Sequence, residues 1–163
     1  MGELSIVNWC RLTGLLLLCV ACADPPAPQE SDSAQALLQK ALALSDSGHA
    51  QQAATLFTRV RQLTPEAAHV HYDLGNALAE LDRIPAAAAA YERAIDLAPD
   101  YAAAYHNLAA VRIRQQKYEQ ALELLERAVT VDPGYGLAFV AMGELCLREG
   151  DFDGARHAFE RAI

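Results

Sequence analysis

Residues 71–99 read HYDLGNALAELDRIPAAAAAYERAIDLAP, and this stretch decides the fold. Leu74 follows His71 by three residues, which places both side chains on one face of a helix. Pro85 precedes five alanines and suits the first turn of a second helix. Pro99 ends that second helix, because the residue before a proline avoids the α region. The stretch therefore predicts two helices joined by a short turn.

The rest of the chain repeats this pattern with a period of 34 residues. Pro65, Pro99 and Pro133 each follow the last by that interval. Alignment at this period divides the chain into the blocks 34–67, 68–101, 102–135 and 136–163. Small residues fill two columns of the alignment and larger ones fill two more: Ala41, Gly75, Ala109 and Gly143; Ala53, Ala87, Ala121 and Ala155; Leu37, His71, Tyr105 and Phe139; Phe57, Tyr91, Leu125 and Phe159. One such hairpin cannot bury its apolar face alone, so we expect the copies to stack.

The second block carries the pattern His71-x2-Leu74-Gly75, Ala87-x3-Tyr91, Ala94 and Pro99, which resembles the tetratricopeptide repeat. The resemblance extends over residues 34–163. It implies an all-α protein, a right-handed α-solenoid of about four stacked helix-turn-helix repeats, with the last repeat truncated. Such a solenoid has a concave face lined by the first helix of each repeat.

The columns have physical reasons. We expect the residues of the Gly75 column to lie opposite those of the Ala87 column, where small side chains let two antiparallel helices approach closely. Gly48 and Gly150 suit the position just after the end of a first helix. The chain stops inside the last helix, so we expect Phe159 and Ile163 to be exposed. Either the polypeptide is longer or a partner covers this end.

Composition supports the helical class and limits the partners. Ala occurs 33 times and Leu 23 times, both strong helix formers, while aromatic residues make up only 7% of the chain. The 21 acidic side chains outnumber 13 basic ones, for a net charge of -8. This balance argues against nucleic acid as a partner, because binding to phosphates needs clustered Lys and Arg. It favours a protein or peptide, and leaves the oligomeric state open.

The N-terminus predicts a targeting segment. Residues 1–22 contain an apolar stretch of about ten residues, too short for a transmembrane helix, which needs about 20. The segment ends in LCVAC, which resembles a bacterial lipoprotein signal with Cys22 as the lipid-attachment site. A plain secretory signal is the alternative. Residues 23–33, ADPPAPQESDS, read as a proline-rich linker. We therefore expect a lipid-anchored, periplasm-facing protein of the cell envelope, or a secreted or periplasmic soluble one.

The resemblance also implies a peptide-binding groove. Its candidate residues lie on the first helices of the second, third and fourth repeats: His69, Tyr72, Asn76, Glu80, His106, Asn107, Arg114, Val140, Glu144 and Arg148. Co-chaperone members of the family hold C-terminal carboxylates with two asparagines and several lysines. Asn76 and Asn107 match the asparagines, but no Lys or Arg stands at the cationic positions, so this specificity is rejected.

The sequence contains no catalytic motif that we recognise: no Gly-rich phosphate loop, GxSxG or HExxH. His69, His71 and His106 lie near one another in the repeat, but His71 occupies a column of large residues, so we expect no metal or cofactor. Cys146 reads as a packing residue. Two functions remain: a non-catalytic interaction scaffold of the cell envelope, similar in layout to the pilus-assembly and peptidoglycan-associated lipoproteins, or the N-terminal docking region of a larger enzyme such as a transferase.

Overall fold

The computed structural model describes residues 33–163, which form eight α-helices and no strand. In chain order these helices are α1 (Ala34–Asp46), α2 (Ala50–Leu63), α3 (Ala68–Glu80), α4 (Ile84–Leu97), α5 (Ala102–Arg114), α6 (Tyr118–Val131), α7 (Gly136–Glu149) and α8 (Phe152–Arg161). The predicted all-α class is confirmed. Cys22 and most of the predicted linker lie outside the described residues.

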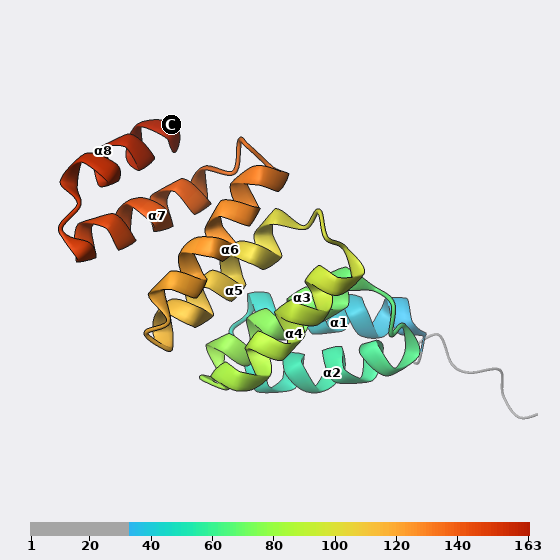
Figure 1. Ribbon diagram of the computed structural model, residues 1–163. Coiled ribbons are helices and arrows are strands. Elements are labelled where there is room, and N and C mark those ends of the chain that lie inside the picture. The colour runs from blue at the N-terminus through green and yellow to red at the C-terminus, as the bar shows by residue number, and fades with distance from the viewer. Residues whose placement is uncertain (1–32) are drawn as a thin grey trace, which may run out of the picture.

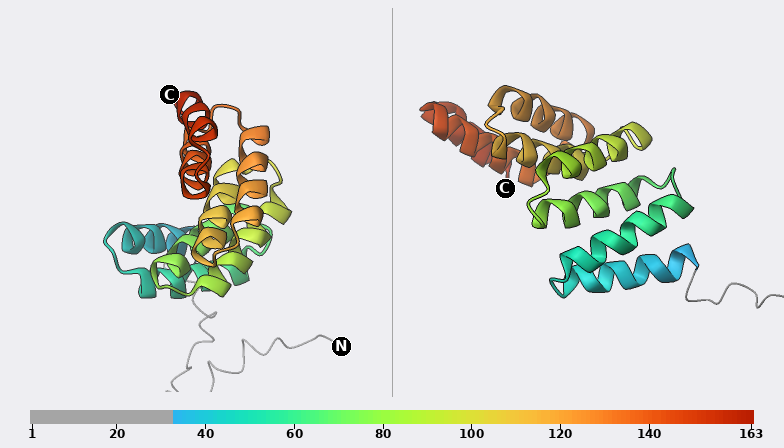
Figure 2. Two further views of the ribbon diagram at one scale, coloured as in Figure 1. Left: turned by 60° about the vertical axis from the view of Figure 1, so that its left-hand side comes forward. Right: turned by 90° about the horizontal axis from the view of Figure 1, so that it is seen from below.

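The helices pack in the order of the chain, each against the one before and the one after, and build one curved stack (Figures 1 and 2). Contacts between helices that are not consecutive join α1 to α3 and α3 to α5, which are all first helices of a repeat. The first helices therefore approach one another more closely than the second helices do, and they line the inner side of the curve. This is the predicted solenoid.

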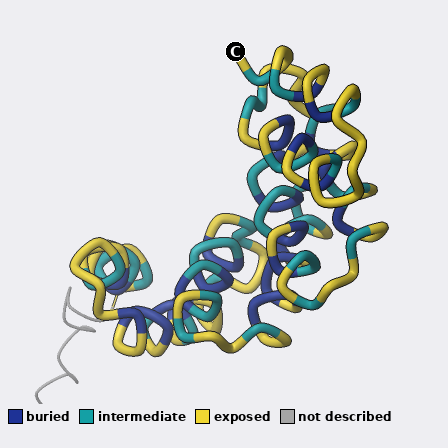
Figure 3. The backbone as a smooth tube through the Cα atoms, turned by 90° about the vertical axis from the view of Figure 1, so that its left-hand side faces the viewer, coloured by how far each residue is buried: buried dark blue, intermediate teal, exposed yellow. Residues whose placement is uncertain are grey.

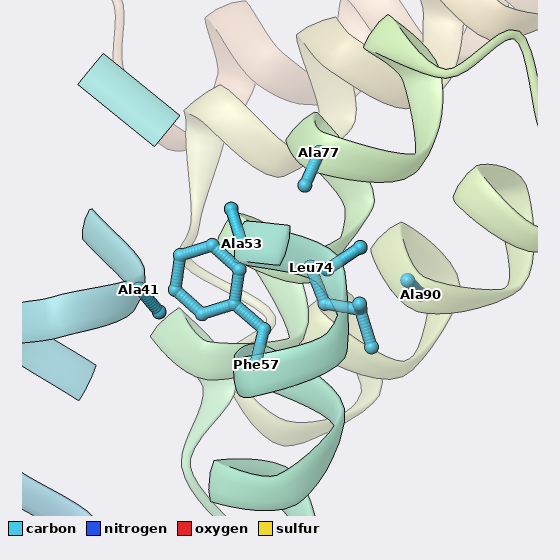
Figure 4. Packing of buried hydrophobic residues seen from close by; sticks show 7 residues of the cluster. Ala41, Ala53, Phe57, Leu74, Ala77 and Ala90 are labelled. Carbon is cyan, nitrogen blue, oxygen red and sulfur yellow. The ribbon is translucent and has the colours of Figure 1, made fainter. Parts of the chain in front are cut away.

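The repeating columns form the buried interior. Figure 3 shows the buried segments where consecutive helices face each other. The four alanines of the second-helix column, from Ala53 to Ala155, are all buried, and so is every residue of the Gly75 column. In Figure 4 the ring of Phe57 lies between Ala41 of α1 and Leu74 of α3, so one large side chain joins two repeats. The alternation of small and large residues that the sequence shows is the packing pattern of the core.

The reason for the glycines differs from the expected one. A Cβ added at Gly75 would lie 2.5 Å from Cε1 of Tyr91, and one at Gly143 would lie 2.6 Å from Cε1 of Phe159. The nearest obstacle is therefore an aromatic ring one turn beyond the alanine column, not the alanine itself. The expectation that Phe159 is exposed was wrong, because this contact leaves its ring half-buried. Ile163 is fully exposed.

The turns also follow the repeat. The second helices α2, α4 and α6 end two residues before Pro65, Pro99 and Pro133, as predicted. The turn between the two helices of each repeat contains one residue with a left-handed backbone, at positions 48, 82, 116 and 150. Glycine occupies the first and last of these positions, whereas Asp82 and Gln116 adopt φ angles of 58° and 61°. Within residues 33–163 no helix has the length and apolar character that crossing a membrane requires.

Candidate functional site

A pocket of about 420 Å³ opens on the inner side of the curve, where α1, α3 and α5 meet. Four of the predicted groove residues line it, namely Asn76, Glu80, Asn107 and Arg114. The remaining lining residues are Ser45, Ala79, Tyr91, Ala110 and Val111. Small and apolar side chains thus form part of the wall, and amide and charged groups form the rest.

Asn76 and Asn107 belong to one hydrogen-bond network that joins three helices. The Nδ2 atom of Asn107 donates to Oδ1 of Asn76 at 2.8 Å and to the hydroxyl of Tyr72 at 3.1 Å. The hydroxyl of Tyr91, from α4, donates to the same Oδ1 of Asn76 at 2.8 Å. Within residues 33–163, Nδ2 of Asn76 and Oδ1 of Asn107 have no hydrogen-bond partner. Two residues that line the pocket therefore keep one donor and one acceptor without a partner, and a peptide bond offers the complementary acceptor and donor.

Three tyrosines, Tyr72, Tyr101 and Tyr135, gather beside this network near the start of α3, α5 and α7, and Tyr91 of α4 adjoins them. The rings of Tyr72 and Tyr101 have centroids 4.9 Å apart, and those of Tyr72 and Tyr91 are 5.9 Å apart. Burial, then the neighbouring Tyr72, Asp73 and Tyr135, raises the pKa of Tyr101 to about 12. Burial and the Tyr72 phenol also raise the pKa of Tyr135. We infer from these interactions that the phenols lie close together.

Tyr101 and Tyr135 were missed as site residues in the sequence. They immediately precede α5 and α7, so they lie outside the first helices to which the repeat assigns the groove positions. Their spacing of 34 residues was a usable signal, because it gives them the same place in successive repeats.

The two arginines of the groove set are engaged within the protein. Arg114 donates to the carboxylate of Asp82 at 2.5 Å and to the main-chain oxygen of Ala79 at 3.3 Å. The guanidinium carbon of Arg148 lies 4.4 Å from the ring centroid of Tyr118, a cation–π contact. Neither cation is placed as a free receptor for a carboxylate ligand.

The remaining candidates extend the surface toward α7. His106 meets the ring of Tyr135 edge to face, with centroids 5.6 Å apart. Burial lowers the pKa of His106, which favours the neutral imidazole, and the carboxylate of Glu144 opposes this shift. The side chains of His69, Val140 and Glu144 are exposed. The structure therefore brings Tyr72, Asn76, Glu80, Asn107 and Arg114 into one site and leaves the other candidates at its edge.

The histidines do not form a metal site. The Nε2 atom of His71 lies 2.9 Å from the main-chain oxygen of Pro65, in the buried interior. In the described part of the chain no group of three or more His, Cys, Asp or Glu side chains could hold a metal ion. Burial, with Asp151 and Glu149, raises the pKa of the Cys146 thiol, which works against a thiolate nucleophile.

A stack of helical hairpins with a polar inner groove defines the class of protein, a helical-repeat interaction protein. Two tetratricopeptide repeat family models match the sequence, one over residues 32–102 and the other over residues 100–163. The chain belongs to the tetratricopeptide repeat family. No curated protein matches the sequence.

Several solved structures share the fold. The crystal structure of MamA is 28% identical, has a TM-score of 0.76, and aligns over 82% of this chain and 78% of its own. MamA of Desulfovibrio magneticus RS-1, from residue 41 to its end, is 26% identical with a TM-score of 0.74, over 82% of this chain and 75% of that one.

Two more distant structures show the fold alone. PilF of Pseudomonas aeruginosa is 21% identical with a TM-score of 0.75, over 82% of this chain and 61% of its own. The first tetratricopeptide repeat domain of Spaghetti (RPAP3), bound to the HSP90 peptide SRMEEVD, is also 21% identical, with a TM-score of 0.69, over 74% and 96% of the two chains. The tetratricopeptide repeat family itself supports a protein–protein interaction scaffold.

Proposed function

We propose that the chain is a non-catalytic scaffold that binds an extended segment of a partner protein in the groove of α1, α3 and α5. The observation that carries this proposal is the amide network, which leaves Nδ2 of Asn76 and Oδ1 of Asn107 at the pocket wall. An extended segment presents a carbonyl and an N–H group at every residue, so a fixed donor and acceptor bind its main chain whatever its sequence.

The network also fixes the geometry of the groove before a ligand arrives. Asn76 accepts hydrogen bonds from α4 and α5, so its side chain is held by two neighbouring helices. Groups that are already ordered lose little conformational entropy on binding, which favours affinity.

Peptide selection tests this function. Twelve-residue peptides selected from a random display library on the purified full chain should lose affinity for Asn107→Ala, measured by fluorescence polarisation. We expect a loss of about tenfold, because one hydrogen bond to the ligand disappears and Asn76 loses its support. Gln62→Ala is the matched control, because Gln62 is an exposed amide on α2. Equal affinity of wild type and Asn107→Ala for every selected peptide would exclude the groove.

We further propose that the scaffold works at the cell envelope, anchored through a lipid on Cys22. The support is the LCVAC sequence at the end of the apolar segment. Metabolic labelling with palmitate in a bacterial host should mark the wild type and not Cys22→Ser, and the labelled protein should sediment with membranes. Cys146→Ser is the control and should keep its label. Label that persists in Cys22→Ser would refute the anchor.

A further inference from the structure

The last turn of each first helix carries a charged residue at the same position of the repeat. These residues are Asp46, Glu80, Arg114 and Arg148, so the acids fall in the first half of the groove and the cations in the second. Arg114 is neutralised by Asp82, and Arg148 lies against the Tyr118 ring. Of these four residues, Asp46 and Glu80 have no ion pair or ring contact among residues 33–163, whereas both arginines have one.

The inner face of α3 carries two carboxylates, Asp73 before Asn76 and Glu80 after it in the helix. Asp73, Asn76 and Glu80 are spaced by three and four residues, which places them on one stripe of the helix. Glu80 lines the pocket. Neither carboxylate has a salt bridge or a hydrogen bond among residues 33–163. Burial raises the pKa of Asp73. The charge of His69, one turn earlier in α3, acts in the opposite direction but is the smaller effect.

The surroundings of these carboxylates suit a long basic side chain. The pocket beside Glu80 is walled by Ala79, Ala110, Val111 and the ring of Tyr91. The methylene stem of a lysine or arginine packs on apolar and aromatic surface of this kind while its charged end reaches a carboxylate. At the other end of the stripe, Tyr72 and Tyr101 lie next to Asp73.

We propose that the partner segment is basic, with two lysine or arginine side chains that pair with Asp73 and Glu80 while Asn76 and Asn107 bind its main chain. This inference rests on the proposed function and names its class of ligand. Seven residues of helix separate Asp73 from Glu80 by about 10 Å along the axis. In an extended segment with a rise of about 3.1 Å per residue, side chains three residues apart match that distance. The expected motif is thus two basic residues separated by two others.

Three synthetic peptides with a fluorescent label test whether the groove prefers a basic ligand. They are SAKAAKAS, its glutamate counterpart SAEAAEAS and the neutral SAQAAQAS. Fluorescence polarisation with the full chain should show that the lysine peptide binds at least about tenfold more tightly than the glutamate peptide, and that its affinity falls with added salt. Equal affinity for the three peptides, or no binding of the lysine peptide, would overturn the inference.

A matched pair of variants tests whether the lysine peptide binds at Asp73 and Glu80. Asp73→Asn with Glu80→Gln should weaken the lysine peptide by about fivefold, as expected for two partly exposed ion pairs. Glu123→Gln with Glu126→Gln removes the same charge from exposed positions of α6, a second helix, and should leave the affinity within about twofold. An equal loss in both variants would show that net charge alone attracts the peptide and would overturn the inference. Circular dichroism confirms that each variant is folded.

These results separate the inference from the function on which it rests. If library peptides without basic residues bind tightly and lose affinity in Asn107→Ala, the groove stands and the proposed charge of its partner is wrong. If no selected peptide depends on Asn107, both fail.

Discussion

At the residue scale, the ring of Tyr91 explains why position 75 is a glycine. Tyr91 is buried against the Cα of Gly75, and its hydroxyl is bonded to Asn76, so the ring has little freedom to move away. Alanine at position 75 favours the helix by about 1 kcal/mol, but forcing a methyl group into a filled space costs about 1–3 kcal/mol. The steric cost prevails here because the added Cβ would lie 2.5 Å from Cε1 of the tyrosine.

Gly75→Ala should therefore lower the free energy of unfolding by about 1 kcal/mol, measured by urea denaturation. Gly134→Ala serves as the control, because a Cβ there lies 3.4 Å from its nearest neighbour, the Asp132 carboxylate, in an exposed turn. A Gly75→Ala protein as stable as the wild type would mean that the ring does not constrain this position.

The left-handed turn residues lead to the opposite change. Gln116 adopts a φ of 61°, a conformation that costs a residue with a Cβ about 1 kcal/mol relative to glycine. Gln116→Gly should raise the free energy of unfolding by up to about 1 kcal/mol, and Gly150→Ala, at φ 82°, should lower it by a similar amount. Thermal unfolding followed by circular dichroism measures both. Changes of the same sign in the two variants would contradict this account.

The sequence predicted the buried residues better than the site because of how each is encoded. Ala87 and Gly75 fill columns that recur every 34 residues, so local spacing identifies them. The partnership of Asn76 with Asn107 depends on how far α3 lies from α5, and spacing within one helix does not state that distance. Tyr91 was assigned to the core column alone, although its hydroxyl reaches the groove network.

At the scale of elements, each first helix has a packing face whose residues repeat and a groove face whose residues do not. One face of α3 packs on α4 and repeats a pattern, which made the fold predictable. The other face carries Tyr72, Asp73, Asn76 and Glu80, which vary from repeat to repeat. Arg114 illustrates the limit: its position on the groove was expected, but its ion pair with the turn residue Asp82 depends on how two repeats meet.

The N-terminal parts of α3, α5 and α7 bring the phenols of Tyr72, Tyr101 and Tyr135 together, and this arrangement has a measurable consequence. The pKa of Tyr101 is raised to about 12 in the folded protein, mainly by burial, against an ordinary value of 10.0. Between these pH values the unfolded chain loses this proton more readily than the folded one. The stabilising contribution is therefore complete below pH 10 and is lost as the pH rises through 12.

Ultraviolet titration at the tyrosinate band should show late ionisation in the wild type, and Tyr101→Phe should reduce its amplitude by one tyrosine, while Tyr91 and Tyr135, whose pKa values are also raised, keep their share. Tyr118→Phe is the control, because Tyr118 lies away from the cluster on α6. If Tyr101→Phe instead removes absorbance change near pH 10, the ordinary tyrosine pKa, then the pKa of Tyr101 is not raised in the folded protein.

At the scale of the whole molecule, the ion pairs and the main helix packing join neighbouring repeats. The ion pairs Arg93–Glu66, Arg112–Glu92 and Arg114–Asp82 each link one repeat to the next. Helix packing in residues 33–163 follows the same rule, since the main helix pairs lie within one repeat or in adjacent repeats. The stability of such a protein is close to a sum over repeats and their interfaces, so an end repeat can be removed without loss of the rest.

A chain ending at Tyr135, which lacks α7 and α8, should therefore stay folded. We expect its helix content per residue to be unchanged, and its free energy of unfolding to fall by about 1–4 kcal/mol, in proportion to the 28 residues removed. Circular dichroism and urea denaturation measure the two quantities.

Removal of α1 and α2 is the informative comparison, because Ser45 of α1 lines the pocket and α7 does not. The first truncation should keep its affinity for a groove peptide while the second loses it. Collapse of both truncated chains to an unfolded state would show that the stack folds only as a whole.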